Sequence, residues 1–192
     1  MRLGAGAAIA ALVMLTALLG VPPAEASGPT PGSAGPAGNC VLRLDRTGTA
    51  GAPVCFDSFQ AAIAFATGGV VTDAPASAGS AATDPAFAAR LATAGPAASA
   101  VLGLEYADIN FGGGSLTLSA PAGCDNSSDV DWQFASLPAS WNDRISSFRS
   151  FSNCIQRLYR DVNFGVALTP ATTSMSWVGS AANDRASSIR FY

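Results

Sequence analysis

Beyond about Ala98, apolar and polar residues alternate in short runs. Leu102, Leu104 and Tyr106 alternate in this way, and so do Leu116 and Leu118 further along the chain. Alternation with a period of two is typical of half-buried strands, and Gly-, Asn- and Asp-rich turns separate the runs. The pattern predicts a mainly β fold class, built as an antiparallel sandwich.

Residues 40–97 have a different pattern of apolar and polar residues. Residues 40–45 alternate like a strand, residues 54–56 predict a second strand, and Asp57 with Gln60 resembles a capping box that starts a helix. We therefore expect a small hairpin-plus-helix appendage over residues 40–69. Residues 70–97 are rich in Ala, Ser, Gly and Pro, which predicts a linker in which Asp84 caps a short helix. A domain boundary near residue 98 follows.

The first 26 residues have the pattern of a secretory signal peptide. Met1-Arg2 is followed by an apolar run over residues 5–20 and by the small-x-small triplet Ala24-Glu25-Ala26. The apolar run is shorter than the roughly 20 residues that span a bilayer, which argues against a retained anchor. We expect a secreted, extracellular protein, not attached to a membrane after cleavage, that begins with a flexible leader over residues 27–39.

Composition removes several classes of function. The net charge is −3, which favours neither nucleic acid nor an acidic membrane as a partner. The sequence contains no histidine, so a Ser-His-Asp triad, a Cys-His pair and a histidine-bound zinc are all excluded. We therefore do not expect an enzyme.

Four cysteines remain to be paired. An even number in an exported protein indicates disulfides, and three pairings are possible. The local pairing, Cys40–Cys55 and Cys124–Cys154, agrees with the segments described above. A four-thiolate zinc site is the alternative, but the close Cys-x-x-Cys spacing is missing.

One six-residue segment occurs twice near the end of the chain. Residues 142–147 and 183–188 are identical except at the fourth position, where Ile145 corresponds to Ala186. Their Asn, Asp and Ser oxygens are ligands that hard cations such as calcium prefer. The alternative is a turn in which these side chains only satisfy backbone groups. A second motif, Tyr106–Gly112, recurs as Tyr159–Gly165, so the two motifs follow each other in the order AB-AB.

These two motifs resemble the calcium-binding microbial branch of the βγ-crystallin family. The resemblance covers residues 98–192, and the second hairpin departs from the family pattern where Val166 replaces a glycine. It implies two Greek-key motifs that form one βγ-crystallin-type sandwich, with Ca²⁺ as the cofactor.

The resemblance also implies two calcium sites shared between the Greek keys. One site would combine the Arg144 carbonyl and Ser146 with Asp184, and the other the Arg185 carbonyl and Ser187 with Asp143. Each site would also take one hairpin carbonyl, from Ala107 or Arg160, and the resemblance leaves open which of the two hairpins belongs to which site. Asn142 and Asn183 would shape the loops or bind through water, while Ser147 and Ser188 would fold each loop onto a hairpin. One carboxylate per site predicts weak binding, with a dissociation constant of about 10⁻⁵ to 10⁻³ M.

The function expected from these observations is a secreted domain that calcium stabilises. The resemblance leaves two alternatives open. One is a secreted metalloproteinase inhibitor, with an extracellular protease as partner and residues 120–131 as its loop, and the other is a killer-toxin-like protein. Trp132, Trp141 and Trp177 could form a sugar-binding platform, but packing in the core or at its rim is the favoured explanation of these tryptophans.

Overall fold

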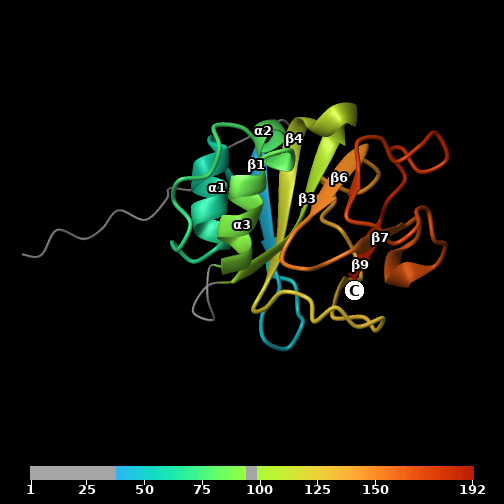
Figure 1. Ribbon diagram of the computed structural model, residues 1–192. Helices are drawn as coiled ribbons and strands as arrows, with labels where there is room; N and C mark the ends of the chain where they lie inside the picture. The colour runs from blue at the N-terminus through green and yellow to red at the C-terminus, as the bar shows by residue number, and fades with distance from the viewer. Residues whose placement is uncertain (1–37, 94–98) are drawn as a thin grey trace, which may run out of the picture.

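Three layers make up the structure, a computed structural model that describes residues 38–93 and 99–192. Helices cover one face of a six-stranded sheet, and a three-stranded sheet lies on its other face (Figure 1). The helices are α1 (Phe59–Ala66), α2 (Ala78–Ala82) and α3 (Pro85–Thr93). The predicted signal peptide and nearly all of the predicted leader lie outside the described residues.

The large sheet has the strand order β2-β1-β4-β3-β6-β8, and the small sheet has the order β5-β9-β7. The strands of the large sheet are β1 (Asn39–Arg43), β2 (Val54–Phe56), β3 (Ala100–Asp108), β4 (Gly112–Ala120), β6 (Ser147–Ser150) and β8 (Ser174–Met175). Those of the small sheet are β5 (Trp132–Phe134), β7 (Gln156–Tyr159) and β9 (Ser188–Phe191). Two short 3₁₀ turns, η1 (Ile109–Phe111) and η2 (Val162–Phe164), follow β3 and β7.

The two Greek keys exchange a strand. β5 belongs to the first half of the repeat, but it pairs with β9 of the second half, with Phe134 opposite Ile189. In return β8 of the second half pairs with β6 of the first, with Phe148 opposite Met175. This mutual exchange confirms the predicted sandwich of two Greek keys.

The large sheet is covered on both faces, by the helices on one and by the small sheet on the other. Successive side chains of a strand point to opposite sides, so each strand contributes to both cores. On β1, Cys40 and Leu42 join the core between the sheets, while Val41 joins the core under the helices. The inter-sheet core also holds Leu118 and Ile189, both fully buried.

The N-terminal part is more integrated than the sequence predicted. Its hairpin is not a separate appendage, because β1 lies parallel to β4 in the large sheet, with Cys40 opposite Leu116. The predicted linker contains both α2 and α3. The buried residues within it include Ala78, Ala81, Ala82 and Phe87. Small alanine side chains let a helix approach the sheet closely, so this composition builds a packed layer. The hydroxyl of Tyr106 on β3 donates a hydrogen bond to the Ala78 carbonyl, at 2.9 Å.

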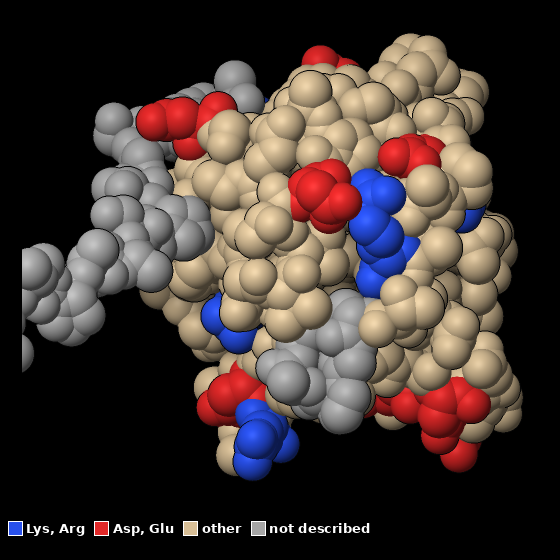
Figure 2. All heavy atoms as spheres, turned by 60° about the vertical axis from the view of Figure 1, so that its left-hand side comes forward, with Lys and Arg blue, Asp and Glu red and all other residues tan. Residues whose placement is uncertain are grey.

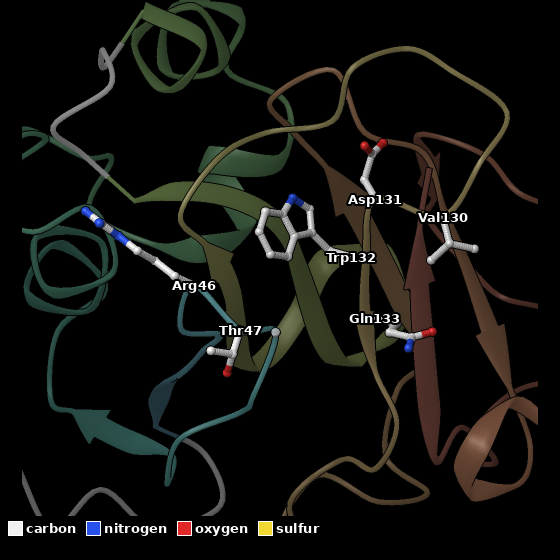
Figure 3. A pocket seen from close by; sticks show the side chains of 7 residues that line it. Arg46, Thr47, Val130, Asp131, Trp132 and Gln133 are labelled. Carbon is white, nitrogen blue, oxygen red and sulfur yellow. The ribbon is translucent and has the colours of Figure 1, made fainter.

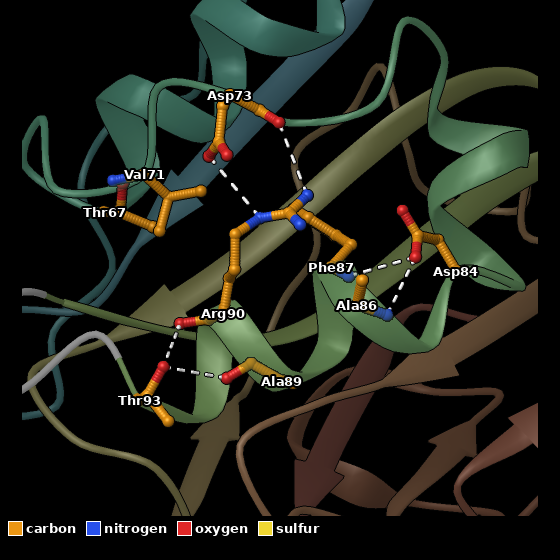
Figure 4. A network of polar contacts seen from close by, with 9 residues as sticks. All are labelled: Thr67, Val71, Asp73, Asp84, Ala86, Phe87, Ala89, Arg90 and Thr93. Atoms are coloured by element: carbon orange, nitrogen blue, oxygen red, sulfur yellow. Dashed lines mark hydrogen bonds and ion pairs between the residues drawn. The ribbon is translucent and has the colours of Figure 1, made fainter.

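Short polar contacts fix the helix ends. Asp84 Oδ1 caps α3 by accepting hydrogen bonds from the backbone N–H groups of Ala86 and Phe87, at 2.8 and 3.1 Å (Figure 4). Arg90, in the last turns of α3, pairs with Asp73 at 3.4 Å. The start of α1 differs from the predicted capping box, because Ser58, not Asp57, accepts the hydrogen bond from the backbone N–H of Ala61.

The cysteines form the local pairs, Cys40–Cys55 and Cys124–Cys154. The first joins the two strands of the N-terminal hairpin, and the second ties the loop after β4 to the segment before β7. Among the described helices, none has the length and apolarity needed to cross a bilayer. Seen from the side of the helices, charged side chains are scattered over a mostly uncharged surface (Figure 2).

Candidate metal centre

The two repeated segments fold into equivalent loops. Asp143 and Asp184 occupy the left-handed region, with φ of 56° and 54°. Asn and Asp tolerate this conformation better than other non-glycine residues, because their short polar side chains bond locally. The conformation places each carboxylate at the outer end of its loop, where it is exposed to solvent.

Backbone hydrogen bonds join the two loops to each other. The N–H of Asp143 donates to the Ala186 carbonyl at 3.0 Å, and the N–H of Asp184 donates to the Ile145 carbonyl at 3.2 Å. Each aspartate therefore lies against the loop of the other Greek key. This reciprocal arrangement is the one that a pair of shared sites requires.

We call each of the two predicted calcium sites a half-site, because each takes residues from both loops. In the first half-site, which contains Ser146 and Asp184, three oxygens converge from three segments. Ser146 Oγ lies 2.9 Å from the carbonyl oxygen of Ala107 and 3.1 Å from Asp184 Oδ1. A hydroxyl has one proton, so it can donate to only one of these two acceptors at a time. A hydroxyl, a carbonyl and a carboxylate with spare lone pairs form a donor set that fits a hard cation. The structure thereby associates the Ala107 hairpin with Ser146 and Asp184.

The second half-site is more open. Asp143, Arg160 and Ser187 line a common cleft of about 690 Å³ together with Asp184 and Arg185. The N–H of Ser187 donates to the Tyr159 carbonyl at 2.9 Å, just as the N–H of Ser146 donates to the Tyr106 carbonyl. Within the described part of the chain, however, no hydrogen bond joins Ser187 to Asp143. The residues predicted for the second site therefore line one cleft, without the direct hydroxyl–carboxylate contact that joins Ser146 to Asp184.

The neighbouring asparagines orient the carboxylates. Asn142 Nδ2 donates to Asp143 Oδ2, and Asn183 Nδ2 donates to Asp184 Oδ2, both at 2.7 Å. Neither contact involves the Oδ1 atom of the aspartate, which in Asp184 faces Ser146 Oγ. Asn183 Oδ1 is buried and has no hydrogen-bond partner among the described residues, so one more oxygen acceptor is unsatisfied beside this site.

The last serine of each repeat has the structural role expected of it. Ser147 Oγ donates to the Asp108 carbonyl at 2.7 Å and accepts a hydrogen bond from the backbone N–H of Phe111. Ser188 Oγ makes the same two contacts in the second hairpin, with the Asp161 carbonyl at 2.6 Å and the N–H of Phe164. The prediction that these hydroxyls fold each loop onto its hairpin is confirmed.

The two hairpins, which follow β3 and β7, have the same backbone conformation in their turns. They differ near Val166, where the sequence of the second hairpin lacks a glycine. Asn110 and Asn163 have φ of 57° and 56°, so both turns have the same left-handed step. Gly113 then has φ of 73°, whereas Gly165 in the second hairpin has a right-handed helical φ of −60°. The second hairpin thus reaches its strand without the left-handed glycine that Val166 replaces.

The arginines of the repeats enter the site through their backbone in the predicted ligand set. The side chain of Arg144 is engaged elsewhere, since its Nη1 donates to the Ser140 carbonyl at 3.2 Å and its guanidinium lies over the Trp141 ring. Arg185 lines the cleft of the second half-site. No group of three or more Asp, Glu, His or Cys side chains lies within metal-binding reach in the described residues. A cation here would rely on one carboxylate with neutral oxygens.

The three tryptophans do not form one platform. Trp141 is buried in the inter-sheet core with 2% of its surface exposed, whereas Trp177 is 52% exposed. Trp132 lines a separate cleft of about 390 Å³ between the β1–β2 loop and the segment before β5, with Arg46 and Gln133 (Figure 3). The segment considered as an inhibitor loop, residues 120–131, is mostly exposed and is anchored by the Cys124–Cys154 disulfide.

Solved structures similar to this chain are microbial βγ-crystallin domains. A domain from Flavobacterium johnsoniae is 30% identical, with a TM-score of 0.34, and the match covers 48% of this chain and 93% of that one. A domain from Clostridium beijerinckii is 27% identical (TM-score 0.37, 47% and 97% covered), and one from an archaeon is 25% identical (TM-score 0.35, 48% and 98% covered). No protein-family model and no curated protein sequence matches the chain.

The TM-scores are low, so we base the assignment on the two motifs repeated in order and on the crossed loops. The chain carries a βγ-crystallin-like domain. The two repeated motifs begin at Tyr106, so the helical layer and the β1–β2 hairpin lie outside the repeat.

Proposed function

We propose that this protein is a non-catalytic, exported βγ-crystallin-type domain whose two crossed loops bind calcium, and that calcium serves to stabilise its fold. The observation that carries the proposal is the convergence of Ser146 Oγ, the Ala107 carbonyl oxygen and Asp184 Oδ1 within about one hydrogen-bond length. The first half-site would hold one ion through these atoms, and the second through Ser187, the Arg160 carbonyl and Asp143.

A stabilising role follows from the segments that the ligands come from. Ala107 is at the end of β3, Ser146 precedes β6, and Asp184 precedes β9 of the other Greek key. An ion bound at this point would join both halves of the sandwich, and it would bind only the folded chain. Binding that is selective for the folded state adds roughly 2.7 kcal/mol to the free energy of unfolding at about 100 times the dissociation constant.

The charge of the site favours weak binding. Each half-site offers one carboxylate to a dication, and the arginines of both repeats lie nearby. Calcium sites with few charged ligands are typical of extracellular modules, where calcium is abundant. Export is supported by the predicted signal peptide and by the two disulfides, which persist in oxidising compartments.

The proposal is tested by thermal unfolding in calcium and in chelator, on the wild type and three variants. Asp184→Asn and Asp143→Asn each remove one ligand carboxylate, while Asp129→Asn removes an exposed carboxylate outside both loops. We expect calcium to raise the melting temperature of the wild type and of Asp129→Asn, by about 5–10 °C at saturation. Each loop variant should lose part of this increase. Equal increases in all four proteins would refute the proposed ligands.

A further inference from the structure

The outer face of the three-stranded sheet carries two arginines side by side. Arg157 on β7 and Arg190 on β9 are direct partners in the antiparallel register. Their chain neighbours Leu158, Ile189 and Phe191 point into the core, so both arginines point outward and are half-buried. Side chains directly opposite on one face lie only about 5 Å apart, and like charges in this position destabilise a sheet.

No carboxylate neutralises this pair. The ion pairs of the described residues involve Arg90 with Asp73 and Arg160 with Asp161, not the two sheet arginines. The Nε atoms of Arg157 and Arg190 are both buried and have no hydrogen-bond partner within the described ranges. Both arginine side chains also interact with the hydroxyl of Tyr159 and, against the effect of burial, help to lower its pKa, so no carboxylate but a neutral hydroxyl is what the described residues offer this pair.

Aromatic rings hold the Arg190 side chain in place. The guanidinium of Arg190 lies 4.1 Å from the ring centroid of Phe164 and 5.6 Å from that of Tyr159. The hydroxyl of Tyr159 is hydrogen-bonded to that of Tyr192, at 2.9 Å. One of these two hydroxyls donates to the other, so one hydroxyl proton of the pair is left to donate to a bound anion.

In the first Greek key, the equivalent face packs against the helices. The position equivalent to Arg157 is Leu104, which is opposite Arg149 and is buried under the helices. Phe151, which corresponds to Tyr192, contacts the ring of Phe87 on α3, with centroids 5.7 Å apart. The second key has the same backbone pairing, but it has a second arginine and a hydroxyl in place of two apolar side chains. In the first key the helices cover this face, whereas in the second key the arginine pair and Tyr192 are partly exposed.

We propose that Arg157 and Arg190 form a binding site for a tetrahedral oxyanion, a sulfate or phosphate group that is either free or carried by a larger molecule. Guanidinium groups bind such anions through paired N–H donors, and two of them can share one anion from adjacent strands. A bound oxyanion would neutralise the like-charge pair and accept hydrogen bonds from the outer guanidinium nitrogens of these half-buried side chains. Gln133, opposite Arg190 on β5, would extend the donors across the sheet.

The test is a nuclear magnetic resonance titration of the arginine Nε–Hε signals at low ionic strength, without divalent cations. Sodium sulfate and sodium phosphate are the ionic probes, sodium chloride at equal ionic strength is the salt control, and dextran sulfate is the polymer probe. We expect saturable shifts of the Arg157 and Arg190 signals with both oxyanions but not with chloride. The dissociation constants of dextran sulfate and sodium sulfate are compared per sulfate group. Tighter binding of dextran sulfate would indicate that the site recognises a sulfated polymer, and equal binding would indicate that it recognises the free ion.

Arg157→Leu is the decisive variant, because the first key accepts leucine at the equivalent position. It should weaken sulfate binding at least about tenfold while its amide spectrum stays that of a folded protein. Arg149→Leu is the control, since it removes the same charge from the first key, at the position equivalent to Arg190. Shifts that do not saturate, shifts equal to those in chloride, or equal losses in the two variants would overturn the proposal.

Discussion

A buried glutamate makes the stability of this protein depend on pH in a predictable direction. Glu105 on β3 is completely buried, and burial raises its pKa from 4.5 to about 8. Gln156 Nε2 donates to both carboxyl oxygens at 2.9 Å, and this contact opposes the increase without cancelling it. Glu105 is therefore protonated in the folded protein at neutral pH.

The direction of the effect follows from the protons bound in each state. Between pH 4.5 and about 8 the folded protein keeps the proton of Glu105, whereas the unfolded chain has lost it. The free energy of unfolding therefore falls as the pH rises through this window, by about 1.4 kcal/mol per pH unit, and levels off above it. The total change is up to about 5 kcal/mol.

The window is unusually free of other titrating groups. The sequence has no histidine, and all four cysteines are in disulfides. Histidine and free cysteine, the side chains whose ordinary pKa values lie in or near this range, are thus both missing from the described residues. A slope in this range can be attributed to Glu105.

The assay is urea unfolding at a series of pH values, followed by tryptophan fluorescence in the presence of a chelator. The wild type should lose stability from pH 5.5 to 8, and Glu105→Gln, which has nearly the same shape and does not titrate, should lose much less. Asp129→Asn, which changes an exposed carboxylate by the same chemistry, should keep the slope of the wild type. A wild-type curve that is flat in this window, or a Glu105→Gln curve with the same slope, would refute the reasoning.

Three further changes should have separate, measurable effects on stability. Tyr106→Phe removes the hydrogen bond to the Ala78 carbonyl and should lower the free energy of unfolding by about 1–3 kcal/mol, as measured in urea, because a buried acceptor is left unpaired. Ser147→Ala removes two contacts to its hairpin and should cost about the same, whereas an unchanged urea midpoint would contradict the structural role of this hydroxyl. Replacing Cys124 and Cys154 by serine opens a loop with a sequence separation of 30 and should cost about 3.6 kcal/mol in the chain-entropy model, which calorimetry can check.

The sequence predicted the sandwich because its signals are local and repeated. Alternating apolar residues indicated strands, and two motifs in the same order indicated two related Greek keys. The roles of Ser147 and Ser188 could also be predicted, since each follows from the position of a hydroxyl within its repeat.

Helix α2 and its packing on the sheet could not be predicted, because its segment lacks the large apolar residues that mark a buried helix face. The parallel pairing of β1 with β4 also leaves no local signal, since Cys40 and Leu116 are far apart in the chain. The same holds for Glu105 and Gln156, which are separated by 51 positions and meet only when the sheets pack. The association of the Ala107 hairpin with Asp184 depends on how the two loops cross, which no residue pattern specifies.

The central claim is that the crossed loops bind calcium, and a calorimetric calcium titration tests it most directly. The wild type should bind two ions with dissociation constants of about 10⁻⁵ to 10⁻³ M. The variant in which both Asp143 and Asp184 are replaced by alanine should bind none at these loops while keeping its fold in chelator. Binding heat that is the same in the wild type and the double variant, or no binding heat in the wild type, would contradict the claim.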